Sequence, residues 1–357
     1  MLAAIDCLRC EPARARFDVV ALAPKQGRLA DELSERGISN FPLQLRDPTG
    51  VRLPREQVCD NLLKAVRESS ADLVHANSLS MGRLSGFVAE ELAVPSIVHL
   101  RDIIKLSLAT VRDLNQNRLL LAVSEATKAF HGEQGLDVAR IRVLLNGVDC
   151  DRFQPRPSHG ILKQELGLPE NAFLAATVGQ IGLRKGQDVL AEAAILAARR
   201  LPNVHYLLVG ERNSSKAESI AFERNVIFRF DGSEFGNQLH RLGYRNNVPR
   251  LMNEFDLLIH HARQEPLGRV LLEAAASGVP IIATRVGGTA EILSDGESAR
   301  LIPPDNPHAL AEAILELHDQ VDQRSRFIEA ARRRVCSAFP IERAAGNLAT
   351  VWAELAG

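Results

Sequence analysis

The stretch "QEPLGRVLLEAAASG", Gln264–Gly278, places two glutamates eight positions apart. Pro266 and Gly268 follow the first glutamate, and an alanine-rich apolar run surrounds the second. Proline suits the first position of a helix, so the stretch predicts a helix that begins at Pro266. Backbone amides at a helix start form an anion site, and a glycine there lets an anion approach closely.

The predicted helix start would bind a diphosphate through the amides of Leu267, Gly268 and Arg269. Bound phosphates would repel a carboxylate, so Glu265 is expected to accept hydrogen bonds from neutral hydroxyls, as on a sugar ring. Glu273, about two turns into the helix, would bind another pair of hydroxyls, such as a ribose diol. The alternative is that Glu265 is only a helix cap and Glu273 only a surface residue.

A second loop, "GQIGLRKGQD", follows a predicted strand and combines glycines with two cations. Gly179 and Gly182 permit a tight turn, and Arg184 and Lys185 would compensate the charge of a diphosphate bound at the first site. The loop has neither the Walker A spacing nor the G-x-G-x-x-G spacing. By itself it is a weak signal, because basic pairs near a helix start are usually solvated.

These loops belong to a chain in which short apolar segments alternate with helical patterns. Such alternation, with strands rich in Val, Leu and Ile, predicts an α/β fold with parallel sheets. The expected strands cover residues 17–24, 71–76, 94–100, 118–124, 172–179, 204–210, 255–261, 278–284 and 299–304, and the expected helices cover 27–37, a stretch that ends at 92, about 186–200, the stretch after Pro266, and 341–355.

A length of 357 residues favours two domains. The segment Asn146–Gly160 is rich in polar, proline and glycine residues, and we interpret it as the linker. The expected domains are 1–150 on the acceptor side and 151–338 on the nucleotide-sugar side, with a helix at 339–357 that packs back toward the first domain. Ligands of doubly wound sheets bind beyond the carboxyl ends of the strands, where both loops lie.

Composition argues against several function classes. The chain has 43 basic and 44 acidic side chains, a net charge of −1, and therefore no overall bias toward nucleic acid. No apolar run approaches the roughly 20 residues of a membrane helix, although a peripheral membrane contact stays open. Five cysteines, an odd and sparse set, indicate a reducing cytosol. Cys7 and Cys10 form a lone C-x-x-C, which we interpret as two small apolar residues rather than a redox pair or half a zinc site.

The chain resembles the glycosyltransferases of the GT-B fold, specifically the retaining enzymes of family four, also called group 1. The spacing of Glu265 and Glu273 matches the E-x7-E motif of that family, and the resemblance covers most of the chain, most specifically its second half. It implies two Rossmann-like doubly wound domains that face a cleft. The segments that carry the resemblance are residues 121–130, 144–155, 176–193 and 244–314.

The resemblance implies an activity. The chain would transfer a hexose from a UDP- or GDP-linked sugar to a hydroxyl of a glycan or lipid-linked acceptor, with retained anomeric configuration and without a further cofactor or metal. Its place would be the cytoplasm, including the inner face of the membrane. Within the second loop, Lys185 would contact the donor diphosphate. Arg184 would assist where Gln180 replaces an arginine that is frequent in the family.

The resemblance also implies roles for the first motif. Glu265 would bind the donor sugar, helped by the amides of Leu267 and Gly268, and Glu273 would bind the ribose. The resemblance places three further positions around the base, namely Tyr244, Arg245 and Val248. It places Gly287, Gly288 and Thr289 in a loop near the donor helix.

In the first half, "VHLRD" (Val98–Asp102) corresponds to the segment where many members place an active-site histidine. Asp102 falls at that position and His99 lies three residues earlier, so both join Glu265 and Lys185 as catalytic candidates. His99 is equally consistent with a buried strand histidine. Other polar residues at the ends of expected strands, which have no metal-ligand pattern, are Arg101, His75, Asn77, His260 and His261.

The chain departs from the family at its start. Members open with a strand and a glycine-rich turn, whereas "MLAAIDCLRC" reads as the first helix and Phe17 already opens the second strand. We therefore expect the first strand of the first domain to be missing. This departure and Gln180 keep an alternative open, a non-catalytic sugar-nucleotide or glycan-binding protein. A nicotinamide-dependent dehydrogenase ranks low because a G-x-G-x-x-G turn is lacking.

Overall fold

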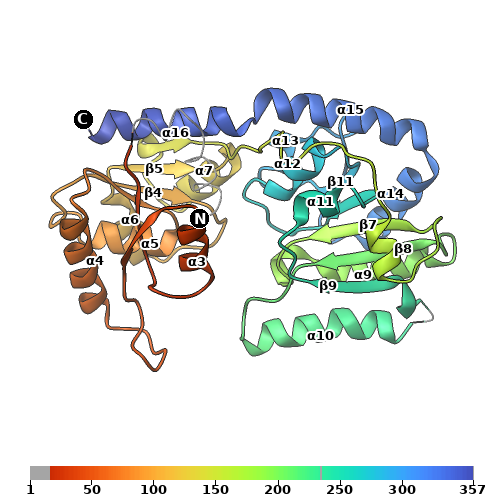
Figure 1. The fold of residues 1–357 in the computed structure, drawn as a ribbon, viewed down its shortest axis with the longest axis horizontal. Coiled ribbons are helices and arrows are strands. Elements are labelled where there is room, and N and C mark those ends of the chain that lie inside the picture. The colour runs from red at the N-terminus through yellow and green to blue at the C-terminus, as the bar shows by residue number, and fades with distance from the viewer. Residues whose placement is uncertain (1–16, 234, 357) are drawn as a thin grey trace. The chain divides into compact units, whose positions relative to one another are not determined.

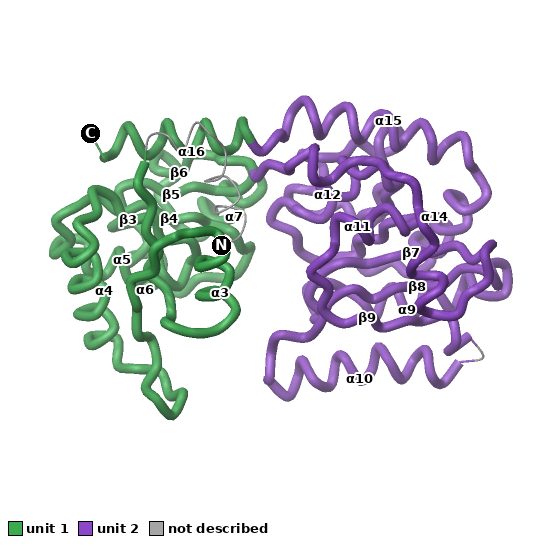
Figure 2. Tube along the Cα trace, viewed as in Figure 1, with its two compact units in different colours: residues 1–145, 342–357 green, residues 146–341 purple. Residues whose placement is uncertain are grey.

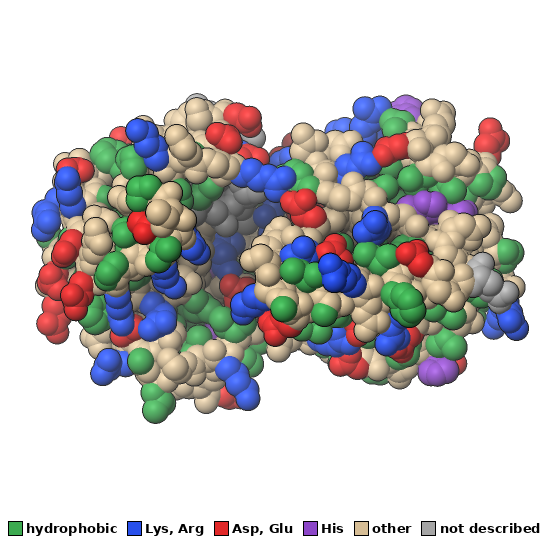
Figure 3. All heavy atoms as spheres, turned by 90° about the horizontal axis from the view of Figure 1, so that it is seen from below, with side chains coloured by type: hydrophobic (Ala, Val, Ile, Leu, Met, Phe, Trp, Pro, Cys, Tyr) green, Lys and Arg blue, Asp and Glu red, His purple; other side chains and the backbone are tan. Residues whose placement is uncertain are grey.

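The computed structural model describes residues 17–233 and 235–356, which form two compact α/β units (Figures 1 and 2). Unit 1 comprises Met1–Leu145 and Glu342–Gly357, and unit 2 comprises Asn146–Ile341. The boundaries between the units therefore follow residues 145 and 341. The boundaries expected from the sequence followed residues 150 and 338. Acidic and basic side chains are interspersed on the face drawn in Figure 3.

Unit 2 is built on a six-stranded sheet with the order β12-β11-β10-β7-β8-β9, in which every pairing is parallel. Its strands are β7 (Phe173–Val178), β8 (Val204–Val209), β9 (Leu239–Gly243), β10 (Leu257–His260), β11 (Ile281–Thr284) and β12 (Arg300–Ile302). Its helices are α8 (Ile161–Glu165), α9 (Gln187–Ala198), α10 (Ala217–Asp231), α11 (Val248–Met252), α12 (Arg269–Ala276), α13 (Thr289–Ile292), α14 (Pro307–Asp319) and α15 (Val321–Ala338), with short 3-10 turns at Leu183–Lys185 and Gly236–Gln238.

The strand order of unit 2 places its site. The chain begins the sheet at β7, builds outward through β8 and β9, and then returns to β10 on the other side of β7. The point between β7 and β10 is therefore a topological switch point, where the following loops diverge and leave a crevice for a ligand. The loops after these two strands contain the two motifs that sequence analysis selected.

The core of unit 2 explains why its strands are continuous apolar runs. β8, β10 and β11 are buried along their whole length, because helices cover both faces of the sheet. Side chains of α9, α10 and α14 join one face of the sheet in a single apolar cluster. On the other side of the unit, α12 packs against α15.

Unit 1 contains two parallel sheets, β1-β2 and β3-β4-β5-β6. Its strands are β1 (Val20–Ala23), β2 (Ser39–Pro42), β3 (Val74–Ala76), β4 (Ser96–Leu100), β5 (Leu119–Ala122) and β6 (Ile141–Val143). Its helices are α3 (Arg28–Glu35), α4 (Arg55–Ser69), α5 (Leu79–Phe87), α6 (Leu108–Asn115), α7 (Glu125–Glu133) and α16 (Ile341–Ala356), with a 3-10 turn at Val138–Arg140.

One strand of unit 1 differs from its prediction. The segment 17–24 was expected to be a buried strand, but only Ala23 of β1 is buried. The reason is that β1 pairs with β2 alone in the described part of the chain, so its small sheet receives less cover than β4 or β5. The predicted first helix, with Cys7 and Cys10, lies outside the described residues.

The C-terminal helix α16 belongs to unit 1, apart from its first residue. Trp352 Nε1 donates to His75 Nδ1 at 3.3 Å, and Glu354 forms an ion pair with Arg142 of β6. The segment predicted as a linker begins inside unit 2, where Val148 N donates to the Phe339 carbonyl at 2.9 Å. No helix in the described ranges is long and apolar enough to cross a bilayer.

Two backbone segments meet closely at the carboxyl end of the unit 2 sheet. Gly210, which follows β8, has a φ of 138°, and a Cβ atom there would lie 1.9 Å from the carbonyl oxygen of Gly179. A side chain at this position therefore has to push apart the loops that follow β7 and β8.

Gly210→Ala should destabilise unit 2 by about 2–3 kcal/mol, through backbone strain and this clash. Urea unfolding followed by far-ultraviolet circular dichroism measures the change. Gly182→Ala is the matched control, because its φ of 171° is extended backbone and no heavy atom of the described residues lies within 4 Å of the added Cβ. Equal stability of the two variants would contradict this packing.

Candidate active site

The candidate site lies at the switch point of unit 2, where the loop after β7 meets the loop after β10. Backbone hydrogen bonds join the two loops directly. The amides of Arg263 and Gln264 both donate to the carbonyl of Arg184, at 2.8 and 3.4 Å. Two segments about 80 positions apart in sequence therefore form one surface.

The helix after Glu265 begins later than predicted. α12 starts at Arg269, and its N-cap is Gly268 with a φ of 99°. This left-handed conformation interrupts the turn that Pro266 was expected to open, so the prediction of a helix start at Pro266 was wrong. The first-turn amides that lack intrahelical acceptors consequently begin at Arg269 rather than at Leu267.

Glu265 makes the most consequential contacts of the site. Its Oε2 atom accepts a hydrogen bond from Lys185 Nζ at 2.6 Å and lies 2.9 Å from His260 Nε2. The Glu265 side chain is 10% exposed and that of Lys185 is 31% exposed. Burial raises the pKa of Glu265, but the bond to His260 and the charge of Lys185 outweigh it and lower the pKa to about 2.

The sequence analysis did not foresee this direct contact between Lys185 and Glu265. Lys185 was expected to face a diphosphate and Glu265 a sugar, whereas here the two side chains form an ion pair with each other. His260 had been considered only as an unpersuasive metal ligand, yet it neighbours the key carboxylate. A signal was present in the sequence, because His260 ends β10 five residues before Glu265.

The loop after β7 is fixed to the end of β10 by a second histidine. His261 Nδ1 donates to the carbonyl oxygen of Lys185 at 2.5 Å. Burial lowers the pKa of His261 to about 3, so the ring is neutral and this bond selects the Nδ1–H tautomer. A Cβ atom on Gly186, whose φ is 69°, would lie 2.4 Å from the His261 carbonyl oxygen, so glycine permits the close approach.

Glu273 is not a plain surface residue. It is the fifth residue of α12, its side chain is 16% exposed, and Arg269 Nη2 lies 3.3 Å from its Oε1 atom. It therefore lies slightly more than one turn into the helix, not two as expected. The loop that was predicted near the donor helix is joined to the site through Gly288 N, which donates to the Glu265 carbonyl at 3.1 Å.

The other predicted donor-side residues lie at the same end of the sheet. Tyr244 follows β9 and is 51% exposed, while Arg245 forms an ion pair with Glu165. Further positions are Val248, the first residue of α11; Thr289, the first residue of α13 and buried; and Gln180 and Arg184, both exposed on the loop after β7.

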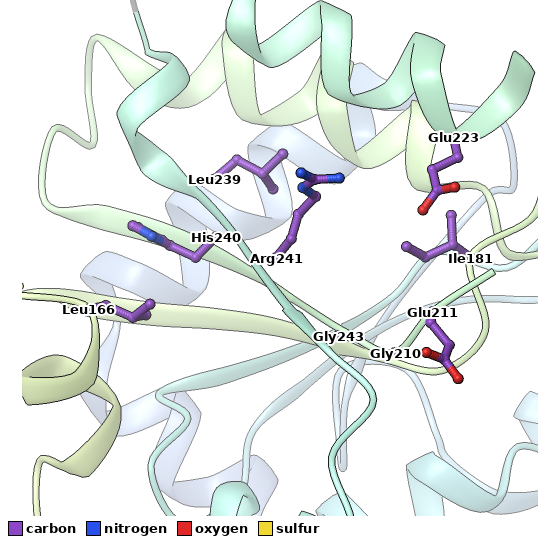
Figure 4. Close-up of a pocket in the computed structure, with 9 residues that line it drawn as sticks. All are labelled: Leu166, Ile181, Gly210, Glu211, Glu223, Leu239, His240, Arg241 and Gly243. Atoms are coloured by element: carbon purple, nitrogen blue, oxygen red, sulfur yellow. The ribbon is translucent and has the colours of Figure 1, made fainter. Parts of the chain in front are cut away.

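A pocket of about 510 Å³ opens beside β9 (Figure 4). Among its lining residues, Gly243 ends β9, Gly210 follows β8, and Ile181 comes from the loop after β7. The remaining lining residues are Leu166, Glu211, Glu223, Leu239, His240 and Arg241. Ile181 lines this pocket and lies on the same loop as Lys185 of the candidate site. Sequence analysis did not select the pocket.

A separate polar cluster lies in unit 1. The rings of His75 and His99 stack with their centroids 5.5 Å apart, and Arg101 bridges His99 Nδ1 at 3.0 Å and Asn77 Oδ1 at 2.8 Å. Burial and the Arg101 charge keep the pKa of His99 well below its usual value, so the ring is neutral. At Asp102, the backbone carbonyl accepts from His131 Nε2 at 2.8 Å.

His99 is 3% exposed, and its Nε2 atom has no hydrogen-bond partner within the described chain. His99 is therefore surrounded as a buried strand histidine would be. The described ranges also hold no group of three or more His, Cys, Asp or Glu side chains that could bind a metal ion.

The depressed pKa of Glu265 predicts a pH dependence of stability. The pKa falls from 4.5 to about 2 on folding, so the ionised carboxylate stabilises the protein above about pH 4.5 and loses this contribution as the pH falls toward 2. Between pH 7 and pH 3.5, the free energy of unfolding should fall by about 1 kcal/mol more in the unsubstituted protein than in Glu265→Gln. Urea titrations at both pH values measure it, and Glu316→Gln is the control. Equal losses in the unsubstituted protein and Glu265→Gln would show that the carboxylate is not held this way.

Comparison with known proteins gives the site its context. A family model described as "Glycosyl transferases group 1" matches residues 159–334, and one described as "Glycosyltransferase Family 4" matches residues 8–152. An α-1,3-galactosyltransferase of Escherichia coli, named for UDP-Gal and GlcNAc-diphosphoundecaprenol, is 24% identical over 85% of this chain and 81% of that protein. The lipopolysaccharide core mannosyltransferase LpsB of Rhizobium meliloti is 28% identical over 73% of this chain and 76% of its own length.

Solved structures agree on the fold. Anabaena HepE in complex with UDP and glucose superposes with a TM-score of 0.87 at 23% identity, over 99% of this chain and 95% of that one. WaaG, a glycosyltransferase involved in lipopolysaccharide biosynthesis, gives a TM-score of 0.74 at 20% identity, over 98% and 95% of the two chains. These matches do not favour the non-catalytic alternative. Two family models that together span most of the sequence, and a fold shared with these enzymes, establish that the chain belongs to the group 1 glycosyltransferases of the GT-B fold.

Proposed function

We propose that this glycosyltransferase moves a hexose from a nucleoside diphosphate sugar to a hydroxyl of a glycan or lipid-linked acceptor, with retained anomeric configuration. The observation that carries the proposal is the ionised Glu265 beside Lys185 at the switch point of unit 2. The relative named for UDP-Gal and the HepE complex with UDP-glucose support a nucleotide sugar as the donor. We also propose a cytoplasmic location, at the inner face of the membrane when the acceptor is lipid-linked.

The diphosphate would bind between the start of α12 and the loop after β7. The first-turn amides of α12 from Arg269 onward supply a positive helix end. Lys185 is within reach of the same region through its contact with Glu265. Because an ammonium group has three N–H donors, Lys185 can keep Glu265 as one partner and bind a phosphate oxygen with another donor. The exposed Arg184 would add a second positive charge.

Glu265 would bind the transferred sugar. With a pKa near 2 its carboxylate is ionised at neutral pH, and an ionised carboxylate only accepts hydrogen bonds. Neutral sugar hydroxyls satisfy it, whereas phosphate oxygens would be repelled. Glu273 would accept from the ribose hydroxyls, with Arg269 holding its carboxylate in place. The base would lie along Tyr244, Arg245 and Val248.

Catalysis would rest on electrostatic stabilisation of the departing diphosphate. Charge develops on the leaving phosphate oxygen, and helix-end amides, Lys185 and Arg184 are fixed donors and cations around that position. Attack by the acceptor hydroxyl from the face on which the diphosphate departs would retain the configuration. The departing phosphate oxygen would take the hydroxyl proton as the bond between the sugar and the diphosphate breaks, so no protein side chain is assigned as base. His99 and Asp102 of unit 1 are proposed to serve the acceptor.

Nucleotide binding tests the donor assignment first. Isothermal titration of the full-length protein with UDP and with GDP should give saturable binding of at least one of them. A transfer assay against a library of nucleotide sugars, with the anomeric configuration of the product read by NMR, then tests sugar and stereochemistry. If neither nucleotide binds at millimolar concentration, the proposed donor site is wrong. If the product has the inverted anomeric configuration, only the retaining mechanism is wrong.

Glu273→Ala should weaken nucleoside diphosphate binding by about 1–3 kcal/mol, the usual contribution of hydrogen bonds to a charged group. Glu316→Ala is the matched control, because Glu316 is also a partly buried glutamate of unit 2 that is paired with an arginine, Arg300 at 3.2 Å. Titration calorimetry compares the two variants. An unchanged affinity for Glu273→Ala would remove Glu273 from the ribose site.

A further inference from the structure

Arg263 lies in the loop after β10, and its side chain contacts several neighbouring segments. Its guanidinium binds both carboxylate oxygens of Asp188, at 2.9 and 2.8 Å, through the two terminal nitrogens. It also donates to Asp305 Oδ1 at 2.6 Å and to the Leu183 carbonyl at 2.8 Å. Such a forked, bidentate geometry is specific to arginine and fixes orientation as well as distance.

These contacts connect three segments around the proposed diphosphate position. Leu183 begins the 3-10 turn that ends at Lys185, Asp188 is in the first turn of α9, and Asp305 lies in the loop after β12. The backbone of Arg263 adds a fourth connection, because its amide donates to the Arg184 carbonyl at 2.8 Å. Arg263 is thus bonded to residues on both sides of Lys185 in the sequence.

Arg263 also compensates negative charge near the proposed diphosphate position. Asp188 and Asp305 bring two carboxylates toward a region that is proposed to bind a dianionic group, and their negative charge opposes such binding. Burial raises the pKa of Asp188, but its hydrogen bonds to Arg263 outweigh this, and the pKa is lowered overall. The Asp188 carboxylate is therefore ionised at neutral pH, and the guanidinium of Arg263, which pairs with Asp188 and with Asp305, compensates part of the local negative charge.

We infer that Arg263 is a positioning residue for the donor diphosphate, which it serves by holding the turn with Lys185 against the loop of Glu265 and by screening Asp188 and Asp305. The inference rests on the proposed function, because it takes the diphosphate to be the ligand of this region. Arg263 acts through Lys185 and needs no contact with the substrate. Its effect is confined to the phosphate end of the donor.

The test compares binding of UDP and uridine, or of GDP and guanosine if the protein prefers that base. Arg263→Gln should lower the affinity for the diphosphate about tenfold or more, the scale of a charge-assisted bond, and change nucleoside affinity less than about twofold. Arg263→Lys keeps the charge without the fork and should fall between. Arg263→Gln combined with Asp188→Asn should recover part of the loss, because one uncompensated carboxylate is gone.

Arg229→Gln is the matched control. Arg229 of α10 pairs with Glu192, which lies on α9 one turn beyond Asp188, so this variant also removes an arginine–carboxylate pair that involves α9. Its UDP affinity should stay within about twofold of the unsubstituted protein. Urea unfolding of each variant measures folding, and Arg263→Lys and the double variant carry the test if Arg263→Gln does not fold.

The outcomes separate the two claims. If the unsubstituted protein binds UDP or GDP and Arg263→Gln binds it as Arg229→Gln does, the positioning role is overturned and the proposed donor site stands. An equal loss for nucleoside and nucleoside diphosphate also overturns the role, because it indicates general damage to unit 2. If the unsubstituted protein binds neither diphosphate, the donor site itself fails and the inference fails with it.

Discussion

A buried, ionised carboxylate at the switch point of the second sheet is the constraint on which the rest of the site depends. Burying the charge of Glu265 is costly unless opposite charge and hydrogen-bond donors surround it. Lys185 meets that need from the loop after β7 and His260 from the end of β10, at 2.6 and 2.9 Å. The contact therefore fixes the distance between the loops that follow β7 and β10, and with it the width of the site.

Close backbone packing supports that contact. Gly186 lets the first loop lie directly against the carbonyl of His261, and Gly210 lets the segment after β8 lie against Gly179. Arg263 then joins the same loop to α9 and to the loop after β12. The site is thus assembled from strand ends whose spacing the parallel sheet sets, and its charges are balanced by side chains that need not touch a substrate.

Much of this arrangement was predictable from sequence. Alternating strands and helices indicated the α/β fold, and the spacing of Glu265 and Glu273, together with the resemblance of residues 244–314, indicated the family. The start of α12 was misplaced by three residues because the left-handed conformation of Gly268 depends on its tertiary setting, whereas proline at a helix start is a local preference. The incomplete burial of β1 was missed because burial depends on neighbouring strands, which local composition does not reveal.

Contacts across long sequence separations were the main omission. Lys185 and Glu265 were both selected, yet their pairing over 80 positions followed only from the strand order, in which β10 returns beside β7. Arg263 was passed over because a single arginine in a loop carries no pattern. Its two carboxylate partners lie 75 and 42 positions away. Arg263 meets Asp188 and Asp305 only after the sheet has formed, so no short sequence motif predicts these ion pairs.

A crystal structure of the protein with a bound nucleoside diphosphate tests the central claim most directly. We expect the β-phosphate to lie between the first-turn amides of α12 and the ammonium group of Lys185, with Glu265 still within hydrogen-bond distance of His260. A diphosphate bound away from the start of α12, or a Lys185 side chain that contacts no phosphate oxygen, would contradict it.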